Sequence, residues 1–292
     1  MMTKIAVVYA TVGRADLAGR SVDHLARQSR PADLVVVSAV SPDDFAQDRD
    51  GPIVPEVLYG EKGLCAQRNR ALAHIAGRAD IVVFFDDDFV PADDYLANLA
   101  TLFDSWPELA GATGWVVADG IKTPGIRFDD AVRQLEGVAA PAEPVVAVLD
   151  GGLYGCNMAM RTSLTEGLWF DEAMPLYGWL EDLDFTFRLR ARGPLVWSDR
   201  LTGVHLGTKG GRTSGMKLGY SQIANPVYML RKRSAPRRHV IELMIRNVAS
   251  NLFLSIRPEP YVDRFGRLRG NLLALRDLAS SRLDPMRVLR LD

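Results

Sequence analysis

Residues Ile81–Phe89 read IVVFFDDDF, and this stretch decides how the rest of the chain is interpreted. Five consecutive apolar residues that favour strands predict a buried β-strand, which ends where three aspartates begin. Adjacent like charges repel one another unless a cation lies beside them, and Asp86 and Asp88 project to the same side of an extended backbone. Carboxylate oxygens at a strand end suit Mg²⁺ or Mn²⁺, which could in turn hold the phosphates of a substrate.

A purely structural interpretation of the same aspartates stays open. Pro91, Asp93 and Asp94 follow at once, and this combination favours the start of a helix. The acids would then belong to a turn that leads into the helix. On this stretch alone, neither interpretation is excluded.

The composition is that of an ordinary globular protein. The chain has 292 residues, 48% of them hydrophobic and 24% charged, which is enough for one large α/β domain or two small ones. No early stretch resembles a signal peptide and no apolar run approaches the ~20 residues that cross a bilayer, so we expect a cytoplasmic protein. Cys65 and Cys156 show no CxxC spacing or disulfide framework, which indicates small buried or semi-buried thiols.

Charge divides the chain into two parts. Residues 226–292 hold 14 Lys and Arg against 6 Asp and Glu, whereas residues 1–225 hold 21 against 30. This asymmetry predicts an acidic body over 1–225 and a basic extension over 226–292. Because the pI of the whole chain is near 6.4, we expect no nucleic-acid binding; the extension is better suited to anionic lipid or to the acidic body itself.

Strand and helix patterns alternate along the first hundred residues. We predict strands at 5–10, 34–40, 54–59 and 81–85, and helices at about 16–28 and 64–76. Such alternation favours an α/β sheet that binds ligands at the carboxyl ends of its strands, where Thr11, Arg14 and the aspartates fall. Neither GxGxxG after the first strand nor GxxxxGK[ST] is present, which leaves metal-bridged phosphate binding by Asp86 and Asp88.

The pattern is weaker from 111 to 149, where only 114–118 predicts a strand. The glycines of the following segment, Asp150–Arg161, permit a close approach of the backbone to a ligand, or only a tight turn into a strand.

A second group of acids opens a helix predicted at about 181–192. Acids in its first turn, arginines in its last and Gly193 after it complement the helix dipole, and this explains the pattern without catalysis. However, Trp179 lies just before the acids and offers a ring on which a carbohydrate acceptor could stack. A carboxylate at the helix start could then serve as a general base.

His205 follows a short strand predicted at 195–197 and precedes the glycine-rich, cationic loop Gly207–Arg212. A lone histidine is usually a packed or surface residue. Here the loop could fold over a diphosphate with Lys209 and Arg212, while the imidazole completes a metal site.

Five motifs occur in a recognisable order: an apolar first strand ending in Thr11 and Arg14, Gly63–Asn69, Phe84–Asp88, Asn157–Arg161, and Glu181–Asp184 followed by Arg188 and Gly193. This ordered set resembles family 2 glycosyltransferases of the GT-A fold over roughly residues 4–210. The resemblance implies a Rossmann-like, mixed central sheet with a nucleotide-sugar-binding half at about 1–110 and an acceptor-binding half at 111–225. A helical, basic C-terminal extension would follow over 226–292.

The activity implied by the resemblance is a metal-dependent, inverting transfer of a sugar, of the hexosyltransferase type, from a nucleotide-diphosphate donor to an acceptor hydroxyl. Asp182 matches the general base, Asp88 and His205 the ligands of Mg²⁺ or Mn²⁺, and Arg68 and Asp86 the donor site. The chemistry of the residues adds Thr11, Arg14, Asp87, Lys209 and Arg212 to the donor side, and Trp179 and Glu181 to the acceptor side. The chain departs from the family at Val37–Ser41, where an Asp that reads the base is usual, and at Ala10 and Gly13, which replace Pro and Asn.

Residues 239–257 predict an amphipathic helix with a wide apolar arc, for which packing on the catalytic domain is one explanation. Basic residues at 231–233, 237 and 238 precede it, so 231–257 could instead hold the protein peripherally at the inner face of the cell membrane, near a lipid-linked glycan acceptor. Polysaccharide or glycan biosynthesis would be the setting.

Two other function classes stay open. A sugar nucleotidyltransferase should carry a glycine-rich, basic signature close after its first strand, and Thr11–Arg14 matches this poorly. A non-catalytic protein that binds sugar nucleotides or polysaccharide would tolerate the loss of Asp182.

Overall fold

The computed structural model describes residues 3–46, 51–139, 141–210, 214–257 and 259–291. The chain divides into two compact units. The sheet unit comprises Met1–Lys62, Ala66–Trp169 and Leu189–Gly211, and the helical unit comprises Gly63–Cys65, Phe170–Arg188 and Arg212–Asp292. Each unit has its own hydrophobic core.

The first half of the sheet unit is parallel, as the alternation of patterns predicts. Its strands are β1 (Ile5–Ala10), β2 (Leu34–Ala39), β3 (Glu56–Tyr59) and β4 (Ile81–Asp86). Between them lie α1 (Ala15–His24), η1 (Leu25–Arg27), η2 (Pro42–Asp44) and α2 (Leu64–Ile75). β1 is buried along almost its whole length, because an apolar run of this kind is covered on both faces of the sheet. Cys65 and Cys156 are buried thiols that form no disulfide within the described residues, as predicted.

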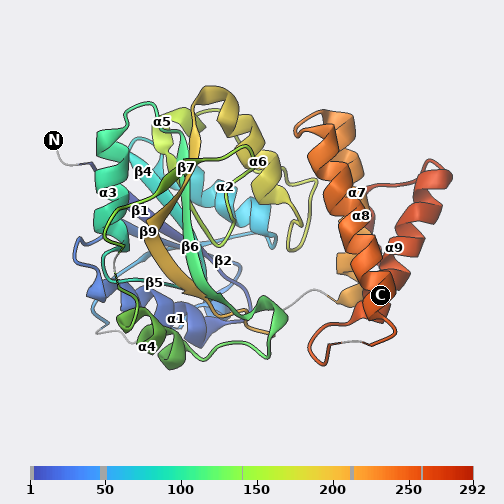
Figure 1. Ribbon diagram of the computed structural model, residues 1–292, viewed down its shortest axis with the longest axis horizontal. Helices are drawn as coiled ribbons and strands as arrows, with labels where there is room; N and C mark the ends of the chain where they lie inside the picture. The colour runs from blue at the N-terminus through green and yellow to red at the C-terminus, as the bar shows by residue number, and fades with distance from the viewer. Residues whose placement is uncertain (1–2, 47–50, 140, 211–213, 258, 292) are drawn as a thin grey trace. The chain divides into compact units, whose positions relative to one another are not determined.

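The second half makes the sheet mixed. Its strands are β5 (Phe89–Pro91), β6 (Gly111–Asp119), β7 (Val146–Val148), β8 (Asn157–Arg161) and β9 (Leu195–His205). Its helices are α3 (Tyr95–Ser105), η3 (Gly120–Lys122), α4 (Phe128–Glu136), α5 (Thr162–Thr165) and η4 (Arg190–Arg192). Within the described residues, the strands follow the order β3-β2-β1-β4-β8-β6-β9-β5, with β7 paired to β9 (Figure 1). β8 is antiparallel to β4 and marks the change of direction.

The short strand predicted at 195–197 is wrong in length: β9 continues for 11 residues to His205. Polar residues interrupt its apolar pattern, but hydrogen bonds within the fold satisfy two of them. The Thr202 hydroxyl donates to the Asp199 carbonyl at 2.8 Å, and the Asp199 carboxylate accepts from the Val145 amide at 3.0 Å. The extra length carries His205 to the strand end beside Phe89 and Asp119, its register partners in β5 and β6.

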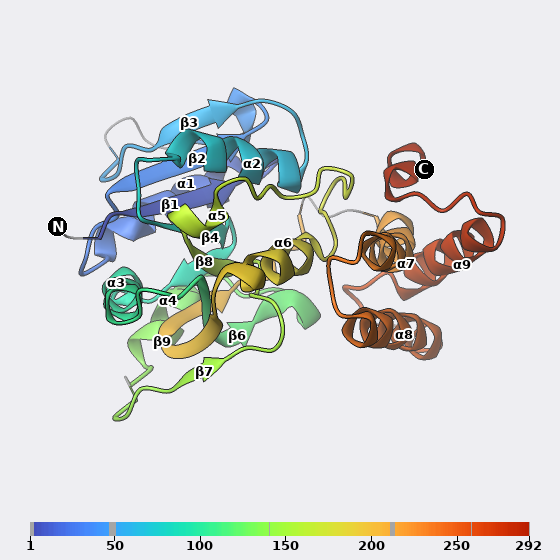
Figure 2. The same ribbon diagram turned by 90° about the horizontal axis from the view of Figure 1, so that it is seen from above.

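The helical unit contains α6 (Glu181–Leu189), α7 (Gly215–Lys232), α8 (Arg237–Leu254), α9 (Arg264–Ala279) and η5 (Pro285–Arg290). The last three α-helices pack beside one another (Figure 2). α7 and α9 touch through their backbones, because a Cβ on Gly219 would lie 2.0 Å from the Arg267 carbonyl oxygen. Asn251 on α8 donates to Gln222 at 2.7 Å and Asn271 at 2.9 Å, linking all three helices.

The helix predicted at 239–257 therefore exists as α8, and its inward residues Met244 and Val248 pack on the core of the helical unit. None of the described helices has both the length and the apolar character needed to cross a membrane.

Candidate functional site

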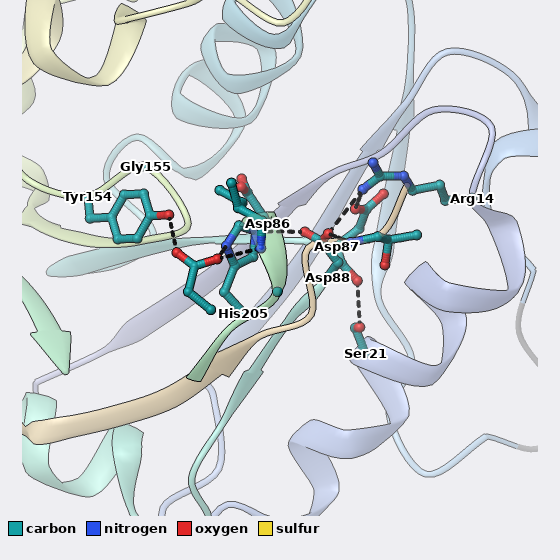
Figure 3. A network of polar contacts seen from close by, with 12 residues as sticks. Arg14, Ser21, Asp86, Asp87, Asp88, Tyr154, Gly155 and His205 are labelled. Carbon is teal, nitrogen blue, oxygen red and sulfur yellow. Dashed lines mark hydrogen bonds and ion pairs between the residues drawn. The ribbon is translucent and has the colours of Figure 1, made fainter. Parts of the chain in front are cut away.

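Three aspartates lie at the end of β4, and Asp87 has different partners from Asp86 and Asp88. Asp86 ends the strand, and Asp87 and Asp88 form the turn into β5. Carboxylate oxygens of Asp86 and Asp88 and a ring nitrogen of His205 all lie within 4.8 Å of one another. We call these three residues the candidate metal cluster (Figure 3). Since Asp87 and Asp88 are about 95% buried, an exposed acidic turn does not describe this site.

Asp87 turns toward the first loop of the chain. Its carboxylate accepts a hydrogen bond from the Thr11 hydroxyl at 2.8 Å and pairs with Arg14 at 2.7 Å (Figure 3). The Ser21 hydroxyl on α1 donates to the Asp87 carbonyl at 2.8 Å. Thr11 and Arg14, both predicted from the sequence, thus hold the turn that presents Asp88.

His205 is held on both of its ring nitrogens. Its Nε2 lies 3.3 Å from Asp88 Oδ1, and its Nδ1 lies 3.1 Å from Asp119 Oδ1. The Tyr154 hydroxyl donates to the other oxygen of Asp119 at 2.9 Å (Figure 3). The second oxygen of Asp88 accepts from the Thr208 amide at 2.8 Å.

Arg68 holds Asp86 through an ion pair. This guanidinium on α2 is 2% exposed, pairs with Asp86 at 3.2 Å and donates to the Gly155 carbonyl at 3.0 Å. Its carbon lies 5.6 Å from the centre of the Phe84 ring. A buried guanidinium with these partners joins the strand that ends in Asp86 to the glycine-rich segment before β8.

Burial and neighbouring charges shift the pKa values of the three aspartates and of His205. Burial raises the pKa of Asp86, and raises the pKa of Asp87 to about 6 although Arg14 opposes this. Burial would also raise the pKa of Asp88, but the hydrogen bond and charge of His205 outweigh it and lower that pKa. For His205, burial favours the neutral ring, but hydrogen bonds to Asp119 and Asp88 raise its pKa to about 10.

This donor set fits a divalent cation. Two carboxylates and one imidazole are ordinary ligands of such ions, and a proton held by His205 is what a metal would replace. The residues of the candidate metal cluster could therefore hold a metal ion.

The loop after His205 is tied to the sheet unit. The Lys209 ammonium donates to the carbonyls of Gly120 at 3.0 Å and Ile121 at 2.8 Å. Arg14 donates to the Gly210 carbonyl at 3.0 Å. Arg212, the other predicted cation of the loop, lies outside the described residues.

The remaining predicted residues belong to the helical unit. Asp182 is the second residue of α6, is partly exposed, and accepts from the Leu183 amide at 2.8 Å. Glu181 is 4% exposed, and the carbonyl of Trp179 accepts from Asn225 on α7 at 2.8 Å.

The backbone before α6 is strained. Leu176 and Leu180 have φ values of 60° and 70°, and Gly178 between them has 62°. A left-handed conformation costs a non-glycine residue roughly 1 kcal/mol, and such strain gathers at functional sites. A side chain at position 178 would approach the Glu181 Cγ to 2.8 Å, so glycine is required there.

Asp184, the last acid of Glu181–Asp184, holds α6 in place. Its fully buried carboxylate pairs with Lys232 on α7 at 2.8 Å and with Arg188 at 2.8 Å. Lys232 also pairs with Asp171 at 2.6 Å. These ion pairs fix the helix whose first turn carries Asp182.

Four residues that contact the site were not predicted from the sequence: Ser21, Asp119, Tyr154 and Thr208. Asp119 ends an apolar run as Asp86 does, so the same signal could have found it. The other three act through hydroxyl or backbone groups, for which the sequence carries no comparable signal.

Comparisons with known proteins bear on the family and the fold of the chain. The model of glycosyl transferase family 2 matches residues 6–168. No curated protein matches the chain.

Two solved structures share the fold. One is the mannosyltransferase PcManGT from Pyrobaculum calidifontis, in complex with GDP-Man and Mn²⁺, with a TM-score of 0.55 and 15% identity over 99% of this chain and 86% of that one. The other is S. aureus TarS 1-349 in complex with UDP-GlcNAc, with a TM-score of 0.54 and 16% identity over 98% of this chain and 82% of that one. At these identities the likeness concerns the fold. The family match covers more than half of the sequence, so the chain belongs to glycosyl transferase family 2 and is a glycosyltransferase of the GT-A fold.

Proposed function

We propose that the protein transfers a sugar from a nucleotide-diphosphate donor to an acceptor hydroxyl with inversion, and that the transfer depends on a divalent metal. The observation that carries this proposal is the candidate metal cluster, in which Asp86, Asp88 and His205 converge at the end of β4. Family membership supplies the reaction class, and the converging acids and imidazole supply a reason for metal dependence.

The residues predicted for the site have the following roles in the proposed reaction. Asp182 takes the proton of the acceptor hydroxyl as the hydroxyl attacks the anomeric carbon in a single displacement, so no covalent intermediate forms. Asp86, Asp88 and His205 would hold a divalent ion, whose positive charge would offset the negative charge that develops on the leaving diphosphate. Lys209 and Arg212 add positive charge beside the diphosphate, and Thr11, Arg14, Arg68, Asp86 and Asp87 form the donor site.

Mn²⁺ or Mg²⁺ is the proposed ion. Mg²⁺ prefers oxygen ligands in an octahedral arrangement, whereas Mn²⁺ is a transition metal that tolerates an imidazole more readily. His205 therefore favours Mn²⁺, and PcManGT, a neighbour in fold, was determined with Mn²⁺ and GDP-Man. The acceptor is a carbohydrate or a lipid-linked glycan that contacts Trp179 and Glu181, in polysaccharide or glycan biosynthesis.

A thermal-shift panel tests donor binding. UDP-, GDP- and dTDP-sugars are added to the full chain with Mn²⁺ and, separately, with EDTA. A ligand at about a hundred times its dissociation constant adds ~2.7 kcal/mol of stability, so one nucleotide class should raise the melting temperature in Mn²⁺ only. Equal shifts in EDTA, or no shift with any sugar nucleotide, would contradict metal-dependent donor binding.

We also propose peripheral binding to the inner face of the cell membrane through residues 231–257. Three apolar residues of α8 share one side of the helix and are 40% to 60% exposed: Ile241, Ile245 and Leu252. Ile256, which follows the helix, is 81% exposed. Arg233, Arg237 and Arg238 are exposed near the start of α8. An exposed apolar side next to arginines suits an anionic bilayer.

Only part of the basic segment is available to lipid. Lys232 pairs with Asp171 and Asp184, and Arg231 donates to the Leu283 carbonyl at 3.3 Å. Neutralising Arg233, Arg237 and Arg238 to Gln should therefore weaken sedimentation with phosphatidylglycerol vesicles by roughly 100-fold, at about 1 kcal/mol for each arginine.

The matched control neutralises three exposed arginines of the sheet unit, Arg20, Arg78 and Arg133, to Gln. This variant loses the same charge and should bind vesicles as the wild type does. Membrane binding through 231–257 is rejected when both triple variants lose binding equally, or when neither does.

A further inference from the structure

The orientation of the His205 imidazole is set by Asp119, a residue outside the candidate metal cluster. Asp119 ends β6 and is the direct register partner of His205, which ends β9. Its Oδ1 lies 3.1 Å from His205 Nδ1, while His205 Nε2 lies 3.3 Å from Asp88. A carboxylate accepts hydrogen bonds only, so Asp119 requires a hydrogen on Nδ1. Nε2 is then the ring nitrogen that faces Asp88, the neighbouring residue of the cluster.

Asp119 is itself held in this orientation. Its Oδ2 accepts from the Tyr154 hydroxyl at 2.9 Å, and the Tyr154 ring meets the His205 ring edge to face with centres 6.1 Å apart. The carbonyl of the next residue, Gly155, accepts from Arg68, which pairs with Asp86. One short segment, Tyr154–Gly155, thus contacts the partners of two cluster residues: Asp119, which holds His205, and Arg68, which pairs with Asp86.

We propose that Asp119, held by Tyr154, is the positioning residue of the metal site: it fixes His205 with hydrogen on Nδ1 and leaves Nε2 for the ion. This inference rests on the proposed metal dependence. Metal-ligating histidines commonly donate their other nitrogen to such a carboxylate, which orients the ring and raises its basicity.

A competing explanation is that Asp119 only caps a helix. Its Oδ1 accepts from the Ile121 amide at 2.9 Å and so begins η3. Two variants separate the roles. Asp119→Ser retains a side-chain oxygen for the cap, because Ser is a good N-cap residue, but its side chain is too short to reach His205. Asp119→Asn retains the shape, but its amide can donate to Nδ1 and so favour the tautomer that cannot offer Nε2.

The test measures Mn²⁺ binding alone by titration calorimetry, on the full chain without donor. Both Asp119 variants should bind Mn²⁺ roughly 10- to 100-fold more weakly than the wild type, and Tyr154→Phe should show a smaller loss in the same direction. The matched control, Asp129→Asn, removes a surface carboxylate that pairs with Arg20, and should bind as the wild type does.

The melting temperature of each metal-free protein shows whether the substitution destabilises the fold. The expected result is a metal-free melting temperature for Asp119→Ser close to that of the wild type, together with weakened Mn²⁺ binding. Wild-type affinity in Asp119→Ser overturns the positioning role while leaving the proposed function intact. Absence of Mn²⁺ binding by the wild type overturns the proposed metal dependence, and the positioning role with it.

Discussion

Asp182→Asn is expected to lower the rate of sugar transfer by roughly 10²- to 10⁴-fold while donor binding stays unchanged, because the amide cannot accept the acceptor proton. The substitution preserves the shape of the side chain, and its oxygen can still accept from the Leu183 amide as the carboxylate does at 2.8 Å. α6 should therefore remain folded. Transfer is measured with the sugar nucleotide that gives the largest thermal shift, and donor binding with the same compound and Mn²⁺.

The control for this variant is Glu242→Gln, which neutralises an exposed acid of α8 that pairs with Arg238. It should transfer sugar at the wild-type rate. Transfer by Asp182→Asn at that same rate would remove Asp182 as the base.

Asp88→Ala is expected to abolish the Mn²⁺-dependent thermal shift by the donor, with a loss of affinity of at least roughly 100-fold. Removal of residues that merely support metal ligands costs 10- to 100-fold, and Asp88 is itself a proposed ligand. The substitution also leaves the His205 ring without its partner at 3.3 Å and the Thr208 amide without its acceptor. Asp88→Asn, which can still accept from Thr208, should show the same loss with less effect on folding.

Asp129→Ala serves as the control, because its carboxylate is exposed and its pair with Arg20 lies on the surface of the same unit. It should keep the full Mn²⁺-dependent shift. Donor binding that persists in both Asp88 variants and still requires Mn²⁺ would show that the ion binds elsewhere.

The strands and helices that frame the site could be predicted because their signals are local. The apolar runs that became β1 and β4 have no polar interruption, and a glycine follows α2. β9 could not be predicted in full, since Asp199 and Thr202 resemble a loop until their hydrogen-bond partners are known. The partner of the Asp199 carboxylate, Val145, is 54 residues away and is brought there by the chain fold.

The candidate site was predictable to the same degree. Asp86 and Asp88 are two residues apart, and an extended backbone projects such residues to the same side, which predicted that they act together. Asp119 is 86 residues from His205, and only the pairing of β6 with β9 brings them together. The sequence also did not reveal that Lys232 holds α6 through Asp184, because that ion pair joins residues 48 positions apart.

The most direct test of metal dependence is an anomalous diffraction map from a crystal soaked with Mn²⁺ and the nucleoside diphosphate of the preferred donor. We expect a manganese peak bounded by Asp86, Asp88 and His205, with Nε2 of His205 as the nearest ring nitrogen. Bound nucleotide with the peak at another position, or with no peak, would contradict the account.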